Sequence, residues 1–289
     1  MADSKILFDF LDSQVRREEY KDLPKGLPST PTRTALPLLP LLSLVETQIT
    51  GNEFKESIFF EMPLGLSDFV WLAPIRTRPR RTYDGYGKEF NPEGEHTPYE
   101  LRKRLLPTNR AKGFCSALEK FGKSSGLFRK VSIHNLGKGA AAPFELLVTL
   151  SGSALRINSV GYGVSQALPV IVEMLVQDKG SWFAIQQPEV HLHPRAQAAL
   201  GDLLFQMSEL EQKHFIIETH SDFMIDRFRL NMQTTKQHKV KAQVLFFERL
   251  GEGNKLSIIP IESDGEYSSE QPKMFRDFFL KEQLSILGI

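Results

Sequence analysis

Residues 182–222 read WFAIQQPEVHLHPRAQAALGDLLFQMSELEQKHFIIETHSD, and their order of apolar and helical segments indicates the fold class. It opens with a short apolar run, WFAI, continues into a helical pattern that begins at Pro194, and closes with a second apolar run, HFII. Proline is well tolerated as the first residue of a helix because its missing N–H has no helical partner there. Short apolar runs joined by a helix are typical of buried parallel strands. The stretch therefore predicts a strand, a helix and a second parallel strand.

The residues around this stretch extend the same order. QALPVIVEMLVQ (166–177) places apolar residues at helical spacing, with Pro169 expected in the first turn, where a proline costs little. FELLVTL (144–150) and ALRINSV (154–160) favour two strands of a hairpin, and the two apolar runs on either side of Gly251 favour another. Strand, helix, strand, helix, strand predicts an α/β protein with a mainly parallel sheet, whose ligand site lies at the carboxyl ends of the strands.

Composition narrows the class of protein. The 289 residues carry a net charge of +1, so no global field steers the chain to nucleic acid or to an anionic membrane. The single cysteine, Cys115, excludes an intramolecular disulfide and a multi-thiolate zinc site. The apolar run at 35–45 is about half of the ~20 residues that a membrane helix needs, and the N-terminus lacks the pattern of a secretory signal. These features favour a cytoplasmic protein that does not bind membranes.

The first half of the chain is less regular. Residues 5–22 favour a charged amphipathic helix, and five prolines between 24 and 40 interrupt any regular element. Residues 58–75 are β-like, and 98–121 predict two helices that Pro107 separates. We expect three regions: an irregular or helical N-terminal region at 1–57, a strand with an arginine-rich loop and a helical insertion at 58–140, and a C-terminal lobe at 141–289.

Three polar clusters follow apolar runs. They are GYGVSQ (161–166), QQPEVHLHP (186–194) and ETHSD (218–222). One such cluster alone is more often turn chemistry than a functional site. Three clusters at the carboxyl ends of strands that a parallel sheet places side by side predict a shared site at that edge.

Taken in order, these residues resemble the second half of an ABC-type P-loop ATPase of the OLD-like AAA family, which is related to RecF and SMC. VGYGVSQALPVI (160–171) is similar to the signature motif and its helix, FAIQQPEVHLHP (183–194) to the Walker B strand and D-loop, and FIIETHSD (215–222) to the switch-histidine loop. WLAPIRTRP (71–79) resembles the PxR stretch before the helical insertion of such proteins. The resemblance implies an ABC-ATPase-like lobe that uses ATP and Mg²⁺ at a dimer interface, in DNA maintenance or anti-phage defence.

The residues of the signature-like segment suit an anion. Gly161 and Gly163 remove side chains where a phosphate must approach backbone N–H groups, and Ser165 and Gln166 begin a helix whose positive end favours a negative charge. The resemblance implies that this segment completes the ATP site of an opposite subunit, and that His220 is the switch histidine that touches the γ-phosphate and the attacking water. The alternative for His220 is a residue that caps the start of a helix.

The Walker B-like strand ends on two amides instead of two carboxylates. The resemblance implies that Gln186 stands at the position that holds hydrated Mg²⁺, that Gln187 stands at the position that polarises water, and that Arg76 contacts phosphate. A glutamine holds a water by a hydrogen bond, but it cannot accept a proton or offset the charge of a metal. Glu189 is the nearest carboxylate and is a candidate to substitute. We therefore expect weak or conditional ATP hydrolysis.

The chain contains no Walker A loop. Gly122-Lys123-Ser124 has Ala117 where GxxxxGK[ST] requires its first glycine, and it follows a helical pattern instead of a strand. The chain therefore resembles a C-terminal half whose N-terminal lobe is incomplete. Three explanations stay open: the missing lobe is a separate polypeptide, the chain starts at an internal methionine of a disrupted gene, or the protein is a nucleotide-independent pseudo-ATPase or interaction subunit. We expect the chain to pair with itself, as a homodimer, or with a Walker A-bearing chain, as a heteromer.

A nuclease activity is not expected of this chain itself. It ends soon after the KLSIIPIE strand (255–262), which leaves no room for a Toprim-type domain. Any effector nuclease is therefore expected to be a partner protein. The closing segment DGEYSSEQPKMFRDFFLKEQL (264–284) is expected to dock a Phe-rich helix on the sheet.

A serine hydrolase is the alternative from another class. Residues 163–167 (GVSQA) approximate the G-x-S-x-G elbow with alanine in the last place, and the order Ser165, Glu189, His220 matches that of α/β-hydrolases. Against this alternative, the elbow leaves QQPEVHLHP and the arginine-rich loop unexplained.

A metal site at His191 and His193 is a weaker possibility, because no cysteine or third histidine nearby supplies the remaining zinc ligands. We expect His193 to be the cap residue before Pro194 instead.

The arginine-rich loop is a candidate DNA contact. RTRPRR places Arg76, Arg78, Arg80 and Arg81 beside tyrosines 83 and 86, a mixture that grips phosphates and stacks on bases. A solvated loop with no partner is an equally good interpretation of this composition.

Overall fold

The computed structural model describes residues 69–85, 87–105, 111–139, 141–251, 253–269, 271–272 and 274–275. All of them belong to one compact unit, Leu66–Ile289. The predicted helix at 5–22, the β-like residues before 69, Tyr86 and the closing residues after 275 lie outside the described residues. The described elements are β1 (Phe69–Leu72), α3 (Thr97–Leu105), α4 (Ala111–Ser125), β2 (Lys130–Asn135), β3 (Phe144–Thr149), β4 (Ala154–Arg156), a 3-10 turn (Ile157–Ser159), α5 (Tyr162–Val176), β5 (Trp182–Gln186), α6 (Pro194–Glu211), β6 (His214–Glu218), α7 (Asp222–Thr234), β7 (Ala242–Leu250) and β8 (Gly253–Ile261).

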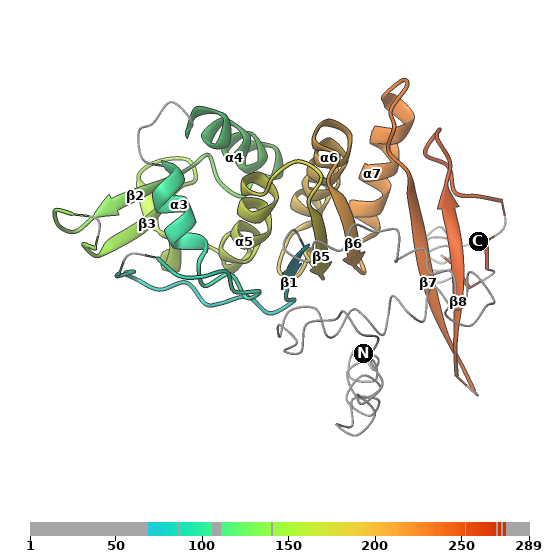
Figure 1. The fold of residues 1–289 in the computed structure, drawn as a ribbon, viewed down its shortest axis with the longest axis horizontal. Helices are drawn as coiled ribbons and strands as arrows, with labels where there is room; N and C mark the ends of the chain where they lie inside the picture. The colour runs from blue at the N-terminus through green and yellow to red at the C-terminus, as the bar shows by residue number, and fades with distance from the viewer. Residues whose placement is uncertain are drawn as a thin grey trace, which may run out of the picture. The chain divides into compact units, whose positions relative to one another are not determined.

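A parallel sheet forms the centre of this unit. Its strand order is β1-β5-β6, and both pairings are parallel. The connection from β5 to β6 runs through α6, which lies beside the sheet in Figure 1. Strand β5 has a fully buried middle, from Phe183 to Ile185, because it is paired on both sides. The predicted strand, helix and parallel strand of residues 182–222 are therefore confirmed.

Two antiparallel sheets accompany the parallel one. β2, β3 and β4 form one of them, and β7 and β8 form the other, so both predicted hairpins are present. The strand predicted at 154–160 is shorter than expected: it ends at Arg156 and passes into a 3-10 turn. Since β4 pairs with β3 in the antiparallel sheet, GYGVSQ does not follow a strand of the parallel sheet. The expectation that all three polar clusters lie at one sheet edge is wrong for this cluster.

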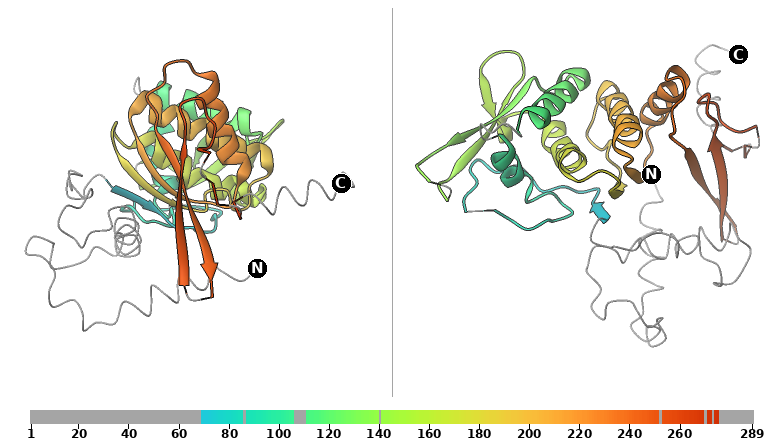
Figure 2. Two further views of the ribbon diagram at one scale, coloured as in Figure 1. Left: turned by 90° about the vertical axis from the view of Figure 1, so that its right-hand side faces the viewer. Right: turned by 45° about the horizontal axis from the view of Figure 1, so that its top comes forward.

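Helix α5 is almost entirely buried, because apolar residues occupy all of its faces. It begins at Tyr162, so Pro169 is its eighth residue, and the prediction that this proline lies in the first turn is wrong. The region predicted to hold two helices contains α3 and α4. α4 packs on both α5 and α6, and α6 packs on α7, a series of helices that the right view of Figure 2 shows side by side.

One hydrophobic core joins these layers. It contains residues of the parallel sheet, of β2 and β3 and of helices α3 to α7, including Leu72, Leu118, Ile171, Phe183 and Leu200. A smaller cluster of Phe205, Met232 and Ile261 joins α6 and α7 to β8. None of the helices in the described residues is long and apolar enough to cross a membrane.

Candidate functional site

The carboxyl ends of β5 and β6 bring two glutamines and a glutamate together. Gln186 pairs with Glu218 in the register of the sheet. Its Nε2 donates to Oε2 of Glu218 at 3.1 Å, and its Oε1 accepts from the indole N–H of Trp71 at 3.3 Å. Gln187 donates from Nε2 to the other carboxylate oxygen, Oε1 of Glu218, at 3.3 Å. Two amides thus hold one half-buried carboxylate from two sides.

Arg76 lies behind this group and is 2% exposed. Its Nη2 donates to the backbone carbonyls of Gln186 and Gln187, at 3.2 and 3.4 Å. Burial lowers the pKa of Arg76 to about 10, while the nearby charge of Glu189 acts in the opposite direction. Its Nε and Nη1 have no hydrogen-bond partner among the described residues. Arg76 therefore supports the end of β5 from inside the protein.

Glu189 connects the segment after β5 to the segment after β6. Its Oε1 accepts a hydrogen bond of 2.7 Å from the backbone N–H of His220, and the residue is 8% exposed. Its Oε2 has no partner within the described part of the chain. The side chain of His220 is exposed, and the residue that caps α7 is Ser221, whose hydroxyl accepts from the N–H of Met224 at 3.1 Å. His220 is therefore not the cap of this helix.

The start of α5 meets the loop that follows β5. A Cβ on Gly163 would lie 2.6 Å from the carbonyl oxygen of His191, whereas one on Gly161 would have open space. The Tyr162 ring packs edge-on against the His191 ring, with centroids 4.9 Å apart. Because of these contacts, GYGVSQ lies against the second cluster even though it follows an antiparallel strand.

Two further predicted residues of this cluster point inward. The Ser165 hydroxyl is 7% exposed and donates to the carbonyl of Tyr162 at 2.8 Å. Gln166 is 2% exposed, and its Nε2 donates to the carbonyl of Arg76 at 3.5 Å. Gln166, Arg76 and Gln186 thus form a buried chain of contacts from α5 to the end of β5.

The backbone of the loop after β5 is unusual at two positions. Gln187 has a φ of 43° and His191 a φ of 67°, so both lie in the left-handed region, which residues other than glycine seldom adopt. His193 caps α6: its ring nitrogen accepts from the N–H of Ala196 at 3.3 Å, and Pro194 is the first helical residue, as predicted.

The described residues thus gather Arg76, Gln186, Gln187, Glu189 and the backbone of His220 at one edge, with Gly163 and Gln166 in contact with that group. Glu218 was not singled out from the sequence, although it stands in the cluster ETHSD. The signal that identifies it is positional: the last residue of β6 pairs with the last residue of β5. Trp71 was missed for the same reason, because its indole reaches Gln186 from the neighbouring strand β1.

The phosphate-loop, serine-hydrolase and metal-site candidates from the sequence are not supported by the structure. Gly122-Lys123-Ser124 lies in α4, where a Cβ on Gly122 would meet the Phe128 ring at 2.4 Å, so it is no phosphate loop. In the described part of the chain no hydrogen bond joins Ser165 to His220, and Ser165 sits inside a helical turn instead of on an exposed elbow. The same residues contain no group of three or more His, Cys, Asp or Glu side chains able to hold a metal ion.

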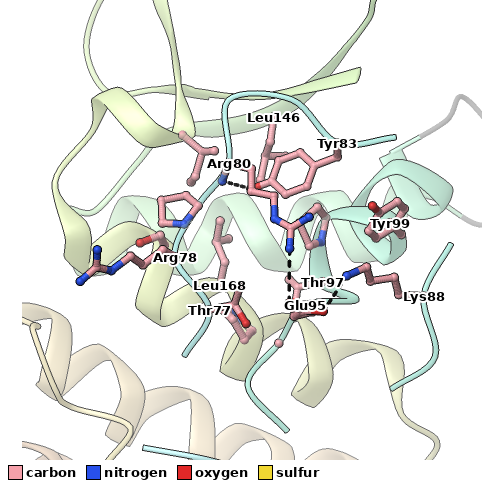
Figure 3. A pocket seen from close by; sticks show the side chains of 16 residues that line it. Thr77, Arg78, Arg80, Tyr83, Lys88, Glu95, Thr97, Tyr99, Leu146 and Leu168 are labelled. Carbon is pink, nitrogen blue, oxygen red and sulfur yellow. Dashed lines mark hydrogen bonds and ion pairs between the residues drawn. The ribbon is translucent and has the colours of Figure 1, made fainter. Parts of the chain in front are cut away.

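A separate pocket lies beside the loop that follows Arg76 (Figure 3). Glu95 forms ion pairs with Arg80 at 3.4 Å and Lys88 at 2.6 Å, and the hydrogen bond from Lys88 lowers the pKa of Glu95. Tyr83 also lines the pocket, but it is 7% exposed and stacks on Phe144, so it does not stack on bases as predicted. Its burial raises its pKa. Arg78, Arg80 and Arg81 are exposed, whereas Arg76 is not.

Comparisons with known proteins point to one family. The model of the AAA ATPase domain matches residues 77–225. A comparison with curated proteins gave no match. Among 47 matching chains of solved structures is one from work on ATP-driven dimerization and DNA-stimulated activation of SMC ATPases, at 11% identity and a TM-score of 0.39, covering 65% of this chain and 97% of that one. Another is the Smc head domain with an extended coiled coil bound to the C-terminal domain of ScpA, from Pyrococcus furiosus, at 11% identity and a TM-score of 0.39, covering 65% of this chain and 42% of that one.

A third is the SmcHead bound to the C-winged helix domain of ScpA, at 12% identity and a TM-score of 0.39, covering 57% of this chain and 50% of that one. The family model, by contrast, spans more than half of the 289 residues, from the loop after Arg76 to the start of α7. This chain belongs to the AAA ATPase domain family.

Proposed function

We propose that this chain is one half of an ABC-class ATP-binding site and binds Mg-ATP at an interface with a second chain. The observation that carries the proposal is the edge where β5 and β6 end. There Gln186 and Gln187 contact Glu218, and Glu189 holds the backbone of His220. In α/β proteins, a nucleotide site usually lies at the carboxyl ends of the parallel strands, where polar groups such as these stand. Membership of an ATPase family supports the same assignment.

The residues divide into two groups in this proposal. Gln187, Glu189 and His220 face the attacking water, and Gln186 faces the hydrated Mg²⁺. Arg76 supports the carbonyls behind them, while Gly161, Gly163, Ser165 and Gln166 shape the start of α5, which is presented to the opposite subunit. A glutamine positions water without accepting its proton, so we propose slow or conditional hydrolysis.

The second chain supplies the phosphate loop. The 289 residues contain no GxxxxGK[ST], and that loop provides the backbone N–H groups and the lysine that hold the phosphates. We propose a heteromer with a Walker A-bearing chain. A homodimer of this chain would need such a chain as a further member of the assembly. We propose a role in DNA maintenance or anti-phage defence, in which an effector such as a nuclease is a partner protein. The exposed arginines 78, 80 and 81 are the proposed DNA contacts.

Titration with a fluorescent ATP analogue tests the proposal. The chain alone is expected to bind weakly, and addition of a partner chain that carries a Walker A loop is expected to give tight, Mg²⁺-dependent binding. The variant Gly161→Arg is expected to block that binding, because its side chain fills the space before α5, where a Cβ would meet no atom of this chain within 4 Å. Tight Mg²⁺-dependent binding by the chain alone would contradict the need for a second lobe. Absence of binding in every combination would favour a pseudo-ATPase.

A further inference from the structure

Glu218 is the acidic side chain that the strand edge leaves accessible. It is half-buried, whereas Glu189 is 8% exposed and already accepts the N–H of His220. A carboxylate has about four lone-pair positions, and the amides of Gln186 and Gln187 use only two of those on Glu218. Glu218 therefore keeps acceptor capacity on the side that the amides do not cover.

The two glutamines are oriented as donors toward this carboxylate. Oε1 of Gln186 accepts from the indole N–H of Trp71, which has no other role than donor, so the NH₂ group of the amide faces Glu218. An amide turned the other way would set its oxygen against the carboxylate. A glutamate at position 186 or 187 would place two anions roughly 3 Å apart, which raises the pKa of one of them. The amides on β5 and the acid on β6 are thus complementary.

The surroundings leave polar capacity unused beside this group. Two nitrogens of the buried Arg76 and Oε2 of the buried Glu189 have no partner among the described residues. Buried polar atoms are nearly always paired, so these atoms mark places for waters: Oε2 of Glu189 can accept from one, whereas the Arg76 nitrogens only donate and can bond a water oxygen but not a cation. Arg76 contacts the same two residues, Gln186 and Gln187, that hold Glu218.

We propose that Glu218 is the residue through which this edge contacts a hydrated divalent cation, with Gln186 and Gln187 as positioning residues. The inference rests on the proposed function, because the cation is the Mg²⁺ that accompanies a nucleotide. Mg²⁺ keeps several waters and binds proteins through one or two carboxylates, which one glutamate on a half-exposed edge can satisfy. The acidic ligand of this proposal thus lies on β6, whereas the resemblance implies a ligand at the end of β5.

A first experiment uses Tb³⁺ alone on the full chain. Tb³⁺ is a hard cation that prefers oxygen ligands, and a tryptophan close by sensitises its emission. Since Trp71 bonds to Gln186, we expect sensitised emission that excess Mg²⁺ displaces and that Trp71→Phe removes, while Trp182→Phe at the far end of β5 retains it. Glu218→Gln is expected to abolish the emission. Glu119→Gln, a substitution of a partly exposed glutamate on α4, is the matched control and is expected to leave it unchanged.

A charge exchange protects this test against a folding defect. The double variant Gln186→Glu/Glu218→Gln keeps one acid and one amide in contact. We expect it to show Tb³⁺ emission again, with a Tb³⁺ affinity within about tenfold of the wild-type affinity, because displaced supporting groups change metal affinity by about that factor. Alanine at both glutamines is expected to weaken Tb³⁺ about 10–100-fold, because the carboxylate loses its orientation. Emission that Glu218→Gln leaves intact would overturn the proposal.

A second experiment separates this inference from the proposed function. In the assembly that binds the ATP analogue, Glu218→Gln is expected to raise the Mg²⁺ concentration at half-binding by at least about tenfold. An unchanged Mg²⁺ dependence would overturn the role of Glu218 and leave the proposed function standing. If the Tb³⁺ result holds and no assembly binds the analogue, the proposed function is wrong and Glu218 remains a cation site.

Discussion

The backbone of Gly163 lies against the carbonyl oxygen of His191, so closely that a Cβ on this glycine would be 2.6 Å from that oxygen. Gly163 is the second residue of α5, and His191 lies in the loop that follows β5. The contact therefore ties the helix start to the strand edge that carries Gln186 and Gln187. It also gives Gly163 a packing role within the chain, independent of any phosphate.

Gly163→Ala is expected to lower the free energy of unfolding by about 1–3 kcal/mol, because an added methyl group meets a backbone atom that cannot turn aside. Gly113 is the matched control: it also lies near the start of a helix, but its Cβ would meet nothing within 4 Å. Gly113→Ala is expected to stabilise the protein by about 0.5–1 kcal/mol. Urea unfolding followed by circular dichroism compares the two, and equal stability of both variants would contradict the contact.

Arg76→Met is expected to destabilise the protein by about 3 kcal/mol. The substitution leaves the carbonyls of Gln186 and Gln187 without their side-chain donor and leaves Glu189 buried without a nearby cation. Arg78→Met, on an exposed arginine two residues later, is expected to change stability by less than about 0.5 kcal/mol. Thermal and urea unfolding measure both variants, and a loss at Arg78 as large as that at Arg76 would show that burial is not the cause.

The acid stability of the antiparallel sheet depends on Glu145. Its hydrogen bonds to Arg156 and, second, to His134 lower the pKa of this carboxyl below its ordinary value of 4.5. A lowered folded-state pKa stabilises the protein above the unfolded value, and the contribution disappears as the pH falls through the folded value. Glu145→Gln is therefore expected to lower the Tm at pH 7, and its difference from wild type is expected to close below about pH 4.5. A difference that stays constant down to pH 3 would refute this account.

The salt dependence of DNA affinity tests whether the exposed arginines 78 and 81 contact DNA phosphates. If both contact phosphates, Arg78→Glu/Arg81→Glu is expected to weaken DNA affinity and to reduce the slope of log K against log salt by about two. The control is Arg195→Glu on α6, because the Arg195 guanidinium bonds the carbonyls of Lys123 and Ser124 instead of facing away from the protein. Fluorescence anisotropy at several salt concentrations gives the slopes. Identical slopes in the wild type and the double variant would remove the loop as a DNA contact.

Local signals explain what the sequence predicted well. The strand, helix and strand of residues 182–222 were readable because apolar runs, the cap His193 and the first-turn Pro194 all act within a few residues. The hairpins at β3–β4 and β7–β8 were readable from turn residues between apolar runs. Pro169 makes the start of this helix hard to predict, because a proline fits best in a first turn, whereas α5 begins at Tyr162, seven residues before Pro169.

Partners from distant parts of the chain explain what the sequence did not reveal. The register of β5 and β6 sets Glu218 against two glutamines that stand 32 and 31 residues before it, and Trp71 reaches them from β1. In the same way, the burial of Arg76 depends on contacts with residues more than 100 positions away. Side-chain chemistry identified the candidates, but only the sheet order shows which of them face one another.

The left-handed backbone at Gln187 and His191 makes it possible to distinguish a role in activity from a role in stability in this loop. Residues with side chains adopt this conformation at a cost of roughly 1–2 kcal/mol, which glycine avoids. The protein keeps an amide and an imidazole at two places where the chain itself would prefer glycine. Exchange to glycine there relieves the backbone cost, which offsets part of the stability lost with the Gln187–Glu218 hydrogen bond or the His191–Tyr162 packing. A loss of activity much larger than the loss of stability therefore belongs to the side chain and not to the fold.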